Sequence, residues 1–402
     1  MADDSNAVEV HAGPTGGVGA SAPPDDPYAE PFRFYDNREK YLLFVTTTSE
    51  KAVVAERIGR ELDHLKPTPP AVRVFDAGTG NGTVIGNVLR DLHRRMPTVP
   101  MVVVGKEFSM EDARLTLQTL PGRLAEHPET IFVLTNMFYA EAPYLYPRTA
   151  ANQEQLQWWD VPLEGTTGHE FHTQIQDLEH VLEAGWQTKI SEKSGNLVYA
   201  KPSVIVLYRS DRAFAMHDMI PRNTGGPQTG GYDLVLAAQP YRSRTPAENK
   251  VRTVLVPLAE ALNPNGRLVV VQSTGHDPGM EIVRRIWPGD EPFASPRGLL
   301  MKELDRQLNG DADRFHFENH DDAASLFSYH LHAMPSEVTN RLSTSTALAA
   351  WNAAVYVAQV DDERVAAAMQ HADYLQVTND VVLKHGGLWF QDESFAIVRN
   401  DS

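Results

Sequence analysis

The sequence has no cysteine, which excludes disulfide bonds and thiol catalysis. It is also poor in basic residues, with 36 Lys and Arg against 53 Asp and Glu and a net charge of −17. Because phosphate binding requires clustered basic side chains, this balance argues against a nucleic-acid partner and mildly favours cationic substrates. No apolar run approaches the length of a membrane span, and the N-terminus lacks the basic start and apolar stretch of a signal peptide. We therefore expect a cytoplasmic protein that binds neither nucleic acid nor membrane.

The length of 402 residues allows one large domain with an insertion, or two domains. Its first residues are rich in Ala, Gly, Pro, Asp and Ser, and such a segment cannot bury enough apolar surface to offset its chain entropy. We predict a disordered N-terminal tail (1–30), an N-terminal helical cap (31–70), a main domain (71–139 and 231–402) and an insertion (140–230).

One short stretch in the first quarter of the chain has the pattern of a strand, a glycine loop and a helix. Residues 72–76 form a β-branched and aromatic run ending in an acid, and Gly78, Gly80 and Gly82 follow before apolar residues recur at helical spacing. Alternate glycines permit positive φ angles and the close approach of a ligand, and the helix N-terminus offers unpaired N–H groups. A dinucleotide fingerprint would need glycine where the chain has Thr83. A tight turn in an ordinary α/β protein is the plain alternative.

A second acidic residue follows the next predicted strand, at residues 102–104. Glu107 lies 31 residues after Asp76, and an acid at this place can accept hydrogen bonds from both hydroxyls of a ribose lying across the strand ends. Asn136 follows a third predicted strand at 130–134, where its amide suits either an adenine amino group or an ordinary strand end.

Further strands are predicted at residues 232–238, 267–272 and 387–398, with helices between them. Strands that alternate with helices through short turns imply right-handed crossovers and a parallel sheet.

These motifs resemble the first and second motifs of class I S-adenosyl-L-methionine (SAM) methyltransferases. The resemblance implies a Rossmann-like α/β fold whose seven-stranded, mostly parallel sheet has an antiparallel last strand and helices on both faces, with the insertion between strands three and four. It also implies SAM as the cofactor of the main domain. The cofactor-binding residues that we expect are Asp76, Gly78, Thr79, Gly80, Gly82, Glu107, Asn136 and Ala238.

The order of the motifs is also similar to that of the histamine N-methyltransferase family, over residues 44–50, 76–82, 107–109, 232–242, 269–273 and 388–397. Carried across, Glu50 falls on the family's amine-binding acid, Gln239 on its glutamine after strand four, and Gln391 on an asparagine near the last strand. The resemblance implies a small-molecule acceptor methylated on an amine or imidazole nitrogen, with the insertion as a substrate lid. Such transfer needs mainly orientation and desolvation, so we assign no catalytic residue.

Simpler interpretations remain beside these. Thr47 and Glu50 have the spacing of a capping box, so Glu50 can serve as a helix cap alone, and Gln239 can satisfy strand-end backbone groups. The histidines lack a tight metal-ligand spacing with acids, and we expect no metal. An O-methyltransferase, a protein methyltransferase and a SAM-binding protein without transferase activity are the alternative functions.

Overall fold

The computed structural model describes residues 38–191, 197–228, 230–308, 312–318, 321–332, 342–371 and 373–401. The predicted tail and the start of the predicted cap, residues 1–37, lie outside the described residues. Within the described part of the chain, no helix is both long and apolar enough to cross a bilayer.

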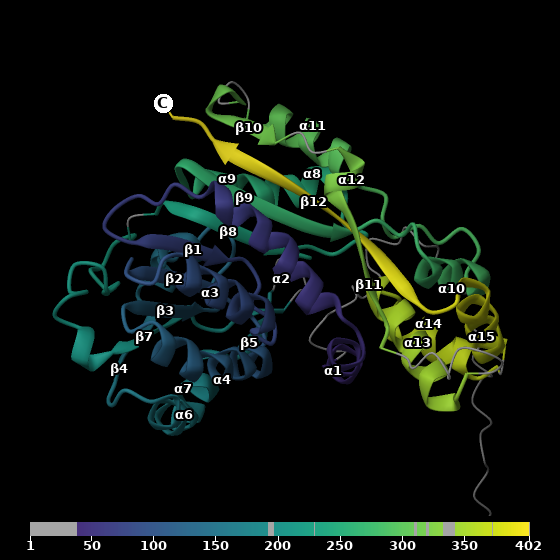
Figure 1. Ribbon diagram of the computed structural model, residues 1–402, viewed down its shortest axis with the longest axis horizontal. Coiled ribbons are helices and arrows are strands. Elements are labelled where there is room, and N and C mark those ends of the chain that lie inside the picture. Colours follow the sequence, from purple (N-terminus) through teal and green to yellow (C-terminus); the bar gives the residue numbers. More distant parts are fainter. Residues whose placement is uncertain are drawn as a thin grey trace, which may run out of the picture.

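One large sheet forms the centre of the molecule (Figure 1). Its ten strands run in the order β10-β12-β9-β8-β1-β2-β3-β7-β4, and β11 also pairs with β12. The bounds are β1 (Val72–Asp76), β2 (Met101–Lys106), β3 (Thr130–Thr135), β4 (Gln157–Leu163), β7 (Ser203–Arg209), β8 (Tyr232–Ala238), β9 (Leu262–Ser273), β10 (Phe315–Glu318), β11 (Leu326–His330) and β12 (Trp389–Arg399). A separate hairpin consists of β5 (Thr188–Ile190) and β6 (Leu197–Tyr199).

The predicted fold class is confirmed, because β3, β2, β1, β8 and β9 are mutually parallel and the last strand, β12, is antiparallel to β9. The predicted number of seven strands is too small. The insertion adds β7, antiparallel to β3, and then β4, while β10 pairs with β12 beside β11. An open sheet edge exposes unpaired backbone N–H and C=O groups, and the β-branched run 203–209 satisfies those of β3.

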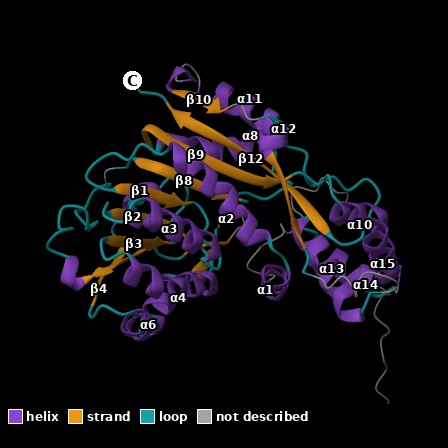
Figure 2. Cartoon of the chain, viewed as in Figure 1, coloured by secondary structure: helices purple, strands orange, loops and turns teal. Residues whose placement is uncertain are grey.

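Helices cover both faces of the sheet (Figure 2). The longer ones are α1 (Arg38–Thr47), α2 (Glu50–Glu61), α3 (Thr83–Arg95), α4 (Met110–Glu126), α6 (Gly168–Gln176), α7 (Glu179–Gly185), α10 (Pro278–Ile286), α11 (Arg297–Leu308), α13 (Thr344–Val357), α14 (Asp362–Met369) and α15 (Asp373–His385). Short helices are α5 (Ala150–Gln153), α8 (Ala247–Lys250), α9 (Val256–Glu260) and α12 (Asp322–Ser325).

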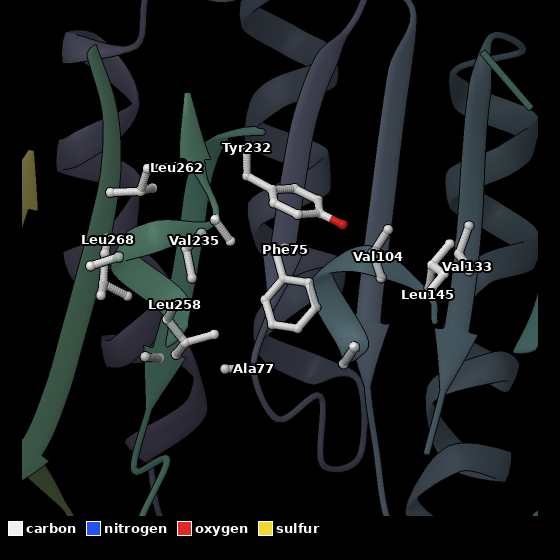
Figure 3. Packing of buried hydrophobic residues seen from close by; sticks show 14 of the residues in the cluster. Phe75, Ala77, Val104, Val133, Leu145, Tyr232, Val235, Leu258, Leu262 and Leu268 are labelled. Atoms are coloured by element: carbon white, nitrogen blue, oxygen red, sulfur yellow. The ribbon is translucent and has the colours of Figure 1, made fainter. Parts of the chain in front are cut away.

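Strand alternation divides the core into two layers. Phe75 and Val104 lie on the same face of the sheet as Leu258 of α9 (Figure 3). Val102 of β2 belongs to the same cluster, whereas Val103 packs with α2, α3 and α4 on the other face. Successive side chains of a strand point to opposite faces, so β-strands buried on both sides are apolar throughout.

A third cluster joins the two ends of the described chain. Tyr41 and Phe44 of α1 pack against α13, which forms a helical lobe beside the sheet together with α10 and α15 (Figure 1). The predicted cap therefore contains two helices in different places, because α1 joins this lobe while α2 packs on α3.

The predicted capping box is wrong. Thr47 ends α1 and its hydroxyl donates to the carbonyl of Leu43, while α2 begins at Glu50 after Ser49, without a side-chain cap. Glu50 is therefore not needed to close a helix end.

A buried charge network links α2 to the far strands. Arg267 of β9 donates to Glu61 at 2.8 Å and pairs with Glu318 of β10, and Arg57 donates to Glu61 at 3.0 Å. Arg267 and Arg57 are each 5% exposed. Such a network stabilises the protein only while every charge keeps its partner.

We expect Glu61→Ala to lower the free energy of unfolding by about 3–5 kcal/mol, because it removes the carboxylate that pairs with the buried Arg57 and leaves the buried Arg267 with Glu318 alone. Glu56→Ala on the same helix is the matched control, since Glu56 is 72% exposed in its pair with Arg60, and its loss should change stability by at most ~0.5 kcal/mol. Urea unfolding of both variants measures the difference. Equal losses of unfolding free energy in the two variants would show that the buried network does not stabilise the protein.

Candidate functional site

The glycine loop lies where β1 and β2 end, and Gly82 fixes its exit into α3. Gly82 has a φ of 78°, and a Cβ added there would lie 2.8 Å from the Thr116 Cα of α4. No other residue fits both the backbone conformation and the close approach of α4.

The other two glycines of the loop have different surroundings. A Cβ on Gly80, whose φ is 52°, would lie 2.8 Å from the hydroxyl of Tyr41, and that hydroxyl accepts a hydrogen bond from the N–H of Asn81 at 3.0 Å. A Cβ on Gly78 would meet no atom within 4 Å. The loop is thus covered by α1 at Gly80 and open to a ligand at Gly78.

The carboxylate of Glu107 holds the loop in place. Its Oε2 accepts from the N–H of Gly80 at 2.8 Å, and its Oε1 accepts from the N–H groups of Phe108 and Ser109 at 2.7 and 2.9 Å. Burial nevertheless raises the pKa of Glu107. A carboxylate has about four acceptor positions, so three backbone donors leave room for a ligand hydroxyl.

Asp76 is the second carboxylate at this site. It is buried at the end of β1, and its Oδ1 accepts from the N–H of Gly78 at 3.1 Å. Burial raises the pKa of Asp76 to about 7, although that N–H bond opposes the change. Two acids in a dry setting favour a ligand that brings a positive charge or hydroxyl donors.

Three further residues predicted for the cofactor have other surroundings. Thr79 is buried, and its Oγ1 lies 2.9 Å from the Thr116 hydroxyl, which ties the loop to α4. Ala238 is half-buried at the end of β8, the strand that pairs with β1 just before the glycine loop. Asn136 is buried, and both hydrogens of its amide are donated to the carbonyls of Gly185 and Lys201 in the insertion. Since its Oδ1 also accepts from Ser203 N, Asn136 fastens the insertion and has no donor for an adenine.

A cavity adjoins this site on the side of α1 and α2, and it brings together two residues predicted to bind the acceptor. It offers about 50 Å³, several times the space that one water molecule needs. The lining residues are Phe44, Glu50, Lys51, Gln239, Ser273, Tyr329, Tyr356, Val357 and Gln359.

Glu50 lies at the wall of this cavity, 3% exposed, with Lys51 Nζ 3.0 Å from its Oε2. Burial acts to lower the pKa of Lys51, but Glu50 and Tyr41 raise it above its ordinary value. Aromatic rings surround the pair, with the centroids of Phe44 and Tyr356 4.9 Å apart. Carboxylate and aromatic faces together favour a cation.

Gln239 is held in the cavity by an unusual backbone conformation. Its φ is 50°, a left-handed angle that residues other than glycine rarely adopt and that is frequent at functional sites. Its Nε2 lies 3.0 Å from Ser273 Oγ and 3.3 Å from Asp392 Oδ2.

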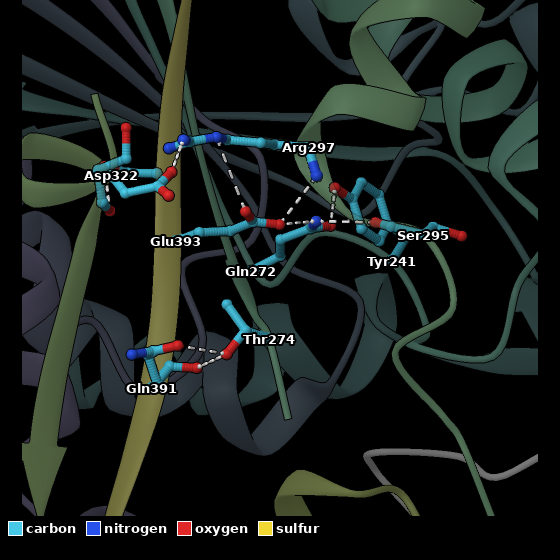
Figure 4. Close-up of polar contacts among 10 residues, drawn as sticks. Tyr241, Gln272, Thr274, Ser295, Arg297, Asp322, Gln391 and Glu393 are labelled. Carbon is cyan, nitrogen blue, oxygen red and sulfur yellow. Dashed lines mark hydrogen bonds and ion pairs between the residues drawn. The ribbon is translucent and has the colours of Figure 1, made fainter. Parts of the chain in front are cut away.

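Gln391 does not line the cavity. Its Oε1 accepts from the Thr274 hydroxyl at 3.0 Å (Figure 4), on the face of β12 opposite to its neighbour Asp392. The next residue, Asp392, lies on the side of the cavity, where Ser273 and Gln239 donate to it.

The insertion lies elsewhere than over the cavity. The cavity lining includes no described residue of 140–230, because β7 and β4 extend the opposite edge of the sheet. The insertion reaches the site at the Glu107 end, where Trp186 Nε1 donates to the Glu107 carbonyl at 2.8 Å. The expectation of a substrate lid is therefore wrong for this cavity.

Four side chains at the site were not predicted from the sequence: Tyr41, Lys51, Ser273 and Asp392. Only Asp392 carried a local signal, since a carboxylate within the apolar pattern of 388–397 is costly to bury without a purpose.

No protein-family model matches this chain, and no curated protein sequence matches it. Solved structures align with it at low similarity. A proposed sarcosine dimethylglycine methyltransferase from Galdieria sulphuraria is 10% identical with a TM-score of 0.32, over 91% of this chain and 90% of its own. A geranyl diphosphate methyltransferase bound to GPP and sinefungin is 11% identical with a TM-score of 0.31, over 87% and 78%. The plantazolicin methyltransferase BpumL bound to SAH is 11% identical with a TM-score of 0.30, over 91% and 88%. Similarity at this level does not establish an activity.

The buried acids predict how stability depends on pH. Burial raises the pKa of Asp76 to about 7 and that of Asp392 to about 8, from 3.8, so the folded protein keeps protons that the unfolded chain has released. Stability must then fall as the pH rises toward 8. Between pH 6.5 and 8 we expect Asp392 to contribute a loss of about 1–2 kcal/mol, which Asp392→Asn should remove.

Urea unfolding of the ligand-free protein at pH 6.5, 7.25 and 8 measures this effect. His93, whose pKa burial lowers to about 3, acts in the opposite direction only below its ordinary value of 6.5, so it does not disturb this range. Identical pH slopes for the wild type and Asp392→Asn would contradict the buried-acid interpretation.

Proposed function

We propose that this chain is a SAM-dependent methyltransferase that methylates a nitrogen of a small amine or imidazole compound. The proposal rests on two features that lie side by side. A glycine loop anchored by Glu107 is open to a ligand at Gly78, and next to it lies a cavity that contains Glu50 and Gln239.

The loop residues suit the nucleoside part of SAM. Glu107 keeps an acceptor position for a ribose hydroxyl, and Gly78 leaves space for close approach of the ligand. SAM also brings an ammonium and a sulfonium, which would stabilise the ionised forms of Asp76 and Glu107. Thr79 and Gly82 hold the loop against α4, and Ala238 lies beside it, whereas Asn136 is left out of the proposed contacts.

The cavity suits an ammonium or imidazole acceptor. In the ligand-free protein Lys51 balances the charge of Glu50, and an ammonium entering between the rings of Phe44, Tyr329 and Tyr356 would share that carboxylate. Gln239 offers both an amide donor and an amide acceptor. These features support the finer proposal of a substrate like those of the histamine N-methyltransferase family.

The chemistry asked of the protein is modest. SAM supplies an electrophilic methyl group, and a neutral nitrogen lone pair must meet it in line. The cavity walls exclude water and fix the direction of approach, which accounts for the aromatic lining.

Ligand binding tests the cofactor. We expect SAM and S-adenosylhomocysteine to raise the melting temperature of the protein and NAD to leave it unchanged, because only a ligand of the folded state stabilises it. Gly78→Val should abolish the shift while leaving the protein folded, since its Cβ meets only ligand space.

Gly122→Val is the matched control, because its Cβ on α4 also meets no atom within 4 Å, at a place away from the loop. A shift with NAD and none with SAM would reject the proposal. SAM binding without turnover of any amine, imidazole, phenol or peptide would instead indicate a binding protein, and turnover of phenols or peptides alone would indicate an O- or protein methyltransferase.

The charge of the acceptor is tested at Glu50. We expect Glu50→Gln to raise KM for a cationic acceptor roughly 100-fold, because an ammonium in a dry cavity loses its carboxylate. SAM affinity should stay unchanged. Glu56→Gln, on the exposed side of the same helix, is the control and should have no kinetic effect. An unaltered KM, or a preferred anionic acceptor, would remove Glu50 from the binding site.

A further inference from the structure

A buried hydrogen-bonded unit lies beneath the acceptor cavity. Ser273 closes β9 and lines the cavity, and its hydroxyl donates to Asp392 Oδ1 at 2.9 Å. Asp392 lies directly opposite Ser273 in the ladder between β12 and β9 and is fully buried. The Gln239 amide approaches the other oxygen of Asp392 at 3.3 Å.

Structural needs do not account for this carboxylate. Its two hydrogen-bond donors are neutral, and among the described residues it forms no ion pair. The charged neighbours that act on it are acids, Glu50 from α2 and Asp277 from the segment before α10. Burying a carboxylate in such surroundings is unfavourable, and an amide would satisfy Ser273 and Gln239 without a charge.

The proposed function leaves a matching chemical need. An amine acceptor that enters as an ammonium has no lone pair, so it must lose a proton before it can attack the methyl group. Glu50 binds the ammonium form of the acceptor, so it stabilises the proton on the nitrogen and does not remove it. A base on another side of the same cavity separates the two tasks.

We propose that Asp392 takes up this proton through the hydroxyl of Ser273, an inference that rests on the proposed methyltransferase function. The ammonium gives a proton to Ser273 Oγ as the hydroxyl proton of Ser273 passes to Asp392 Oδ1. The freed nitrogen lone pair then forms the N–C bond while the S–C bond of SAM breaks and its electron pair stays on sulfur. The products are a methylated ammonium, S-adenosylhomocysteine and one proton held by Asp392, which water later removes.

The strength of the base fits this task. Burial raises the pKa of Asp392 to about 8, and Glu50 adds to the increase. Compared with a carboxylate at the ordinary 3.8, this group accepts a proton from an ammonium roughly ten-thousand-fold more favourably. A base with a pKa near the working pH is the most effective general base.

Gln239 is a positioning residue in this arrangement. Its left-handed backbone directs the amide toward Asp392 Oδ2, which leaves Oδ1 to the Ser273 hydroxyl. The titratable groups facing Asp392 are Glu50 and Asp277, together with the phenol of Tyr329 on β11. Lys51 faces Glu50 from the next position on α2.

The test compares pH profiles of kcat/KM for two probes, 2-phenylethylamine and 4-methylimidazole, with methyl-labelled SAM. For the amine, the wild type should show a rise with a midpoint near pH 8. Asp392→Asn and Ser273→Ala should lower the amine rate at pH 7.5 by about 100-fold or more and move the rise toward the pKa of the free amine, roughly 10. A large part of the imidazole is neutral at this pH without any base, so both variants should methylate it at nearly the wild-type rate. Ser273→Thr, which keeps the hydroxyl, should keep the wild-type amine profile.

Glu393→Gln is the matched control. Glu393 is the next residue of β12 and is also buried, but it faces the other side, where it accepts from Gln272 Nε2 and Arg297 N (Figure 4). Its variant should keep the wild-type profile. SAM affinity should be unchanged in all four variants, which separates loss of the relay from loss of the fold.

Three outcomes would overturn the relay. An unchanged amine profile in Asp392→Asn, or equal losses for amine and imidazole, would show that Asp392 is only structural while the methyltransferase function stands. Wild-type protein that binds SAM but methylates neither probe would reject the proposed function, and the relay with it.

Discussion

The site depends on the hydrogen bond between the Gly80 N–H and the carboxylate of Glu107. Through this bond the end of β2 fixes the loop after β1, and the loop in turn fixes the start of α3 and the place of Tyr41 above it. The Glu107 carboxylate is buried and accepts three backbone N–H bonds, so a ligand can reach it only where the loop is open. The shape and the electrostatics of the glycine loop therefore have a common origin.

The arrangement of the glycine loop and its two acids could be predicted from the sequence because its determinants are local. Asp76, the three glycines and Glu107 each follow directly on a strand, and parallel strands bring their carboxyl ends to one edge of the sheet. That Glu50 and Gln239 lie at the same cavity could be predicted only from the family resemblance. Residues so far apart in the chain share no local pattern that would indicate a contact. Gln391 shows the limit of that route, because successive residues of a strand alternate between faces and this side chain lies on the face away from the cavity.

Other features depend on pairings that no local pattern records. Ser203 to Arg209 looks like any buried strand, and nothing in it reveals that it pairs with β3 and that the Ser203 N–H donates to Asn136 Oδ1. The capping-box spacing of Thr47 and Glu50 was real, but packing of α1 in the helical lobe ended that helix at Thr47 and freed Glu50 for the cavity. In the second case tertiary packing overrode the local preference.

The position of β12 has a consequence for how the molecule is made. This strand is the last in the described chain, yet it lies inside the sheet between β9 and β10, and β11 pairs only with it. As the chain leaves the ribosome, β9 and the segment carrying β11 remain unpaired edges until residues 389–399 have been synthesised. The loop near Gly80 can form early, whereas the floor of the cavity appears only at the end. A nascent chain would thus form the glycine loop well before the cavity, and it would need protection from edge-to-edge association in the interval.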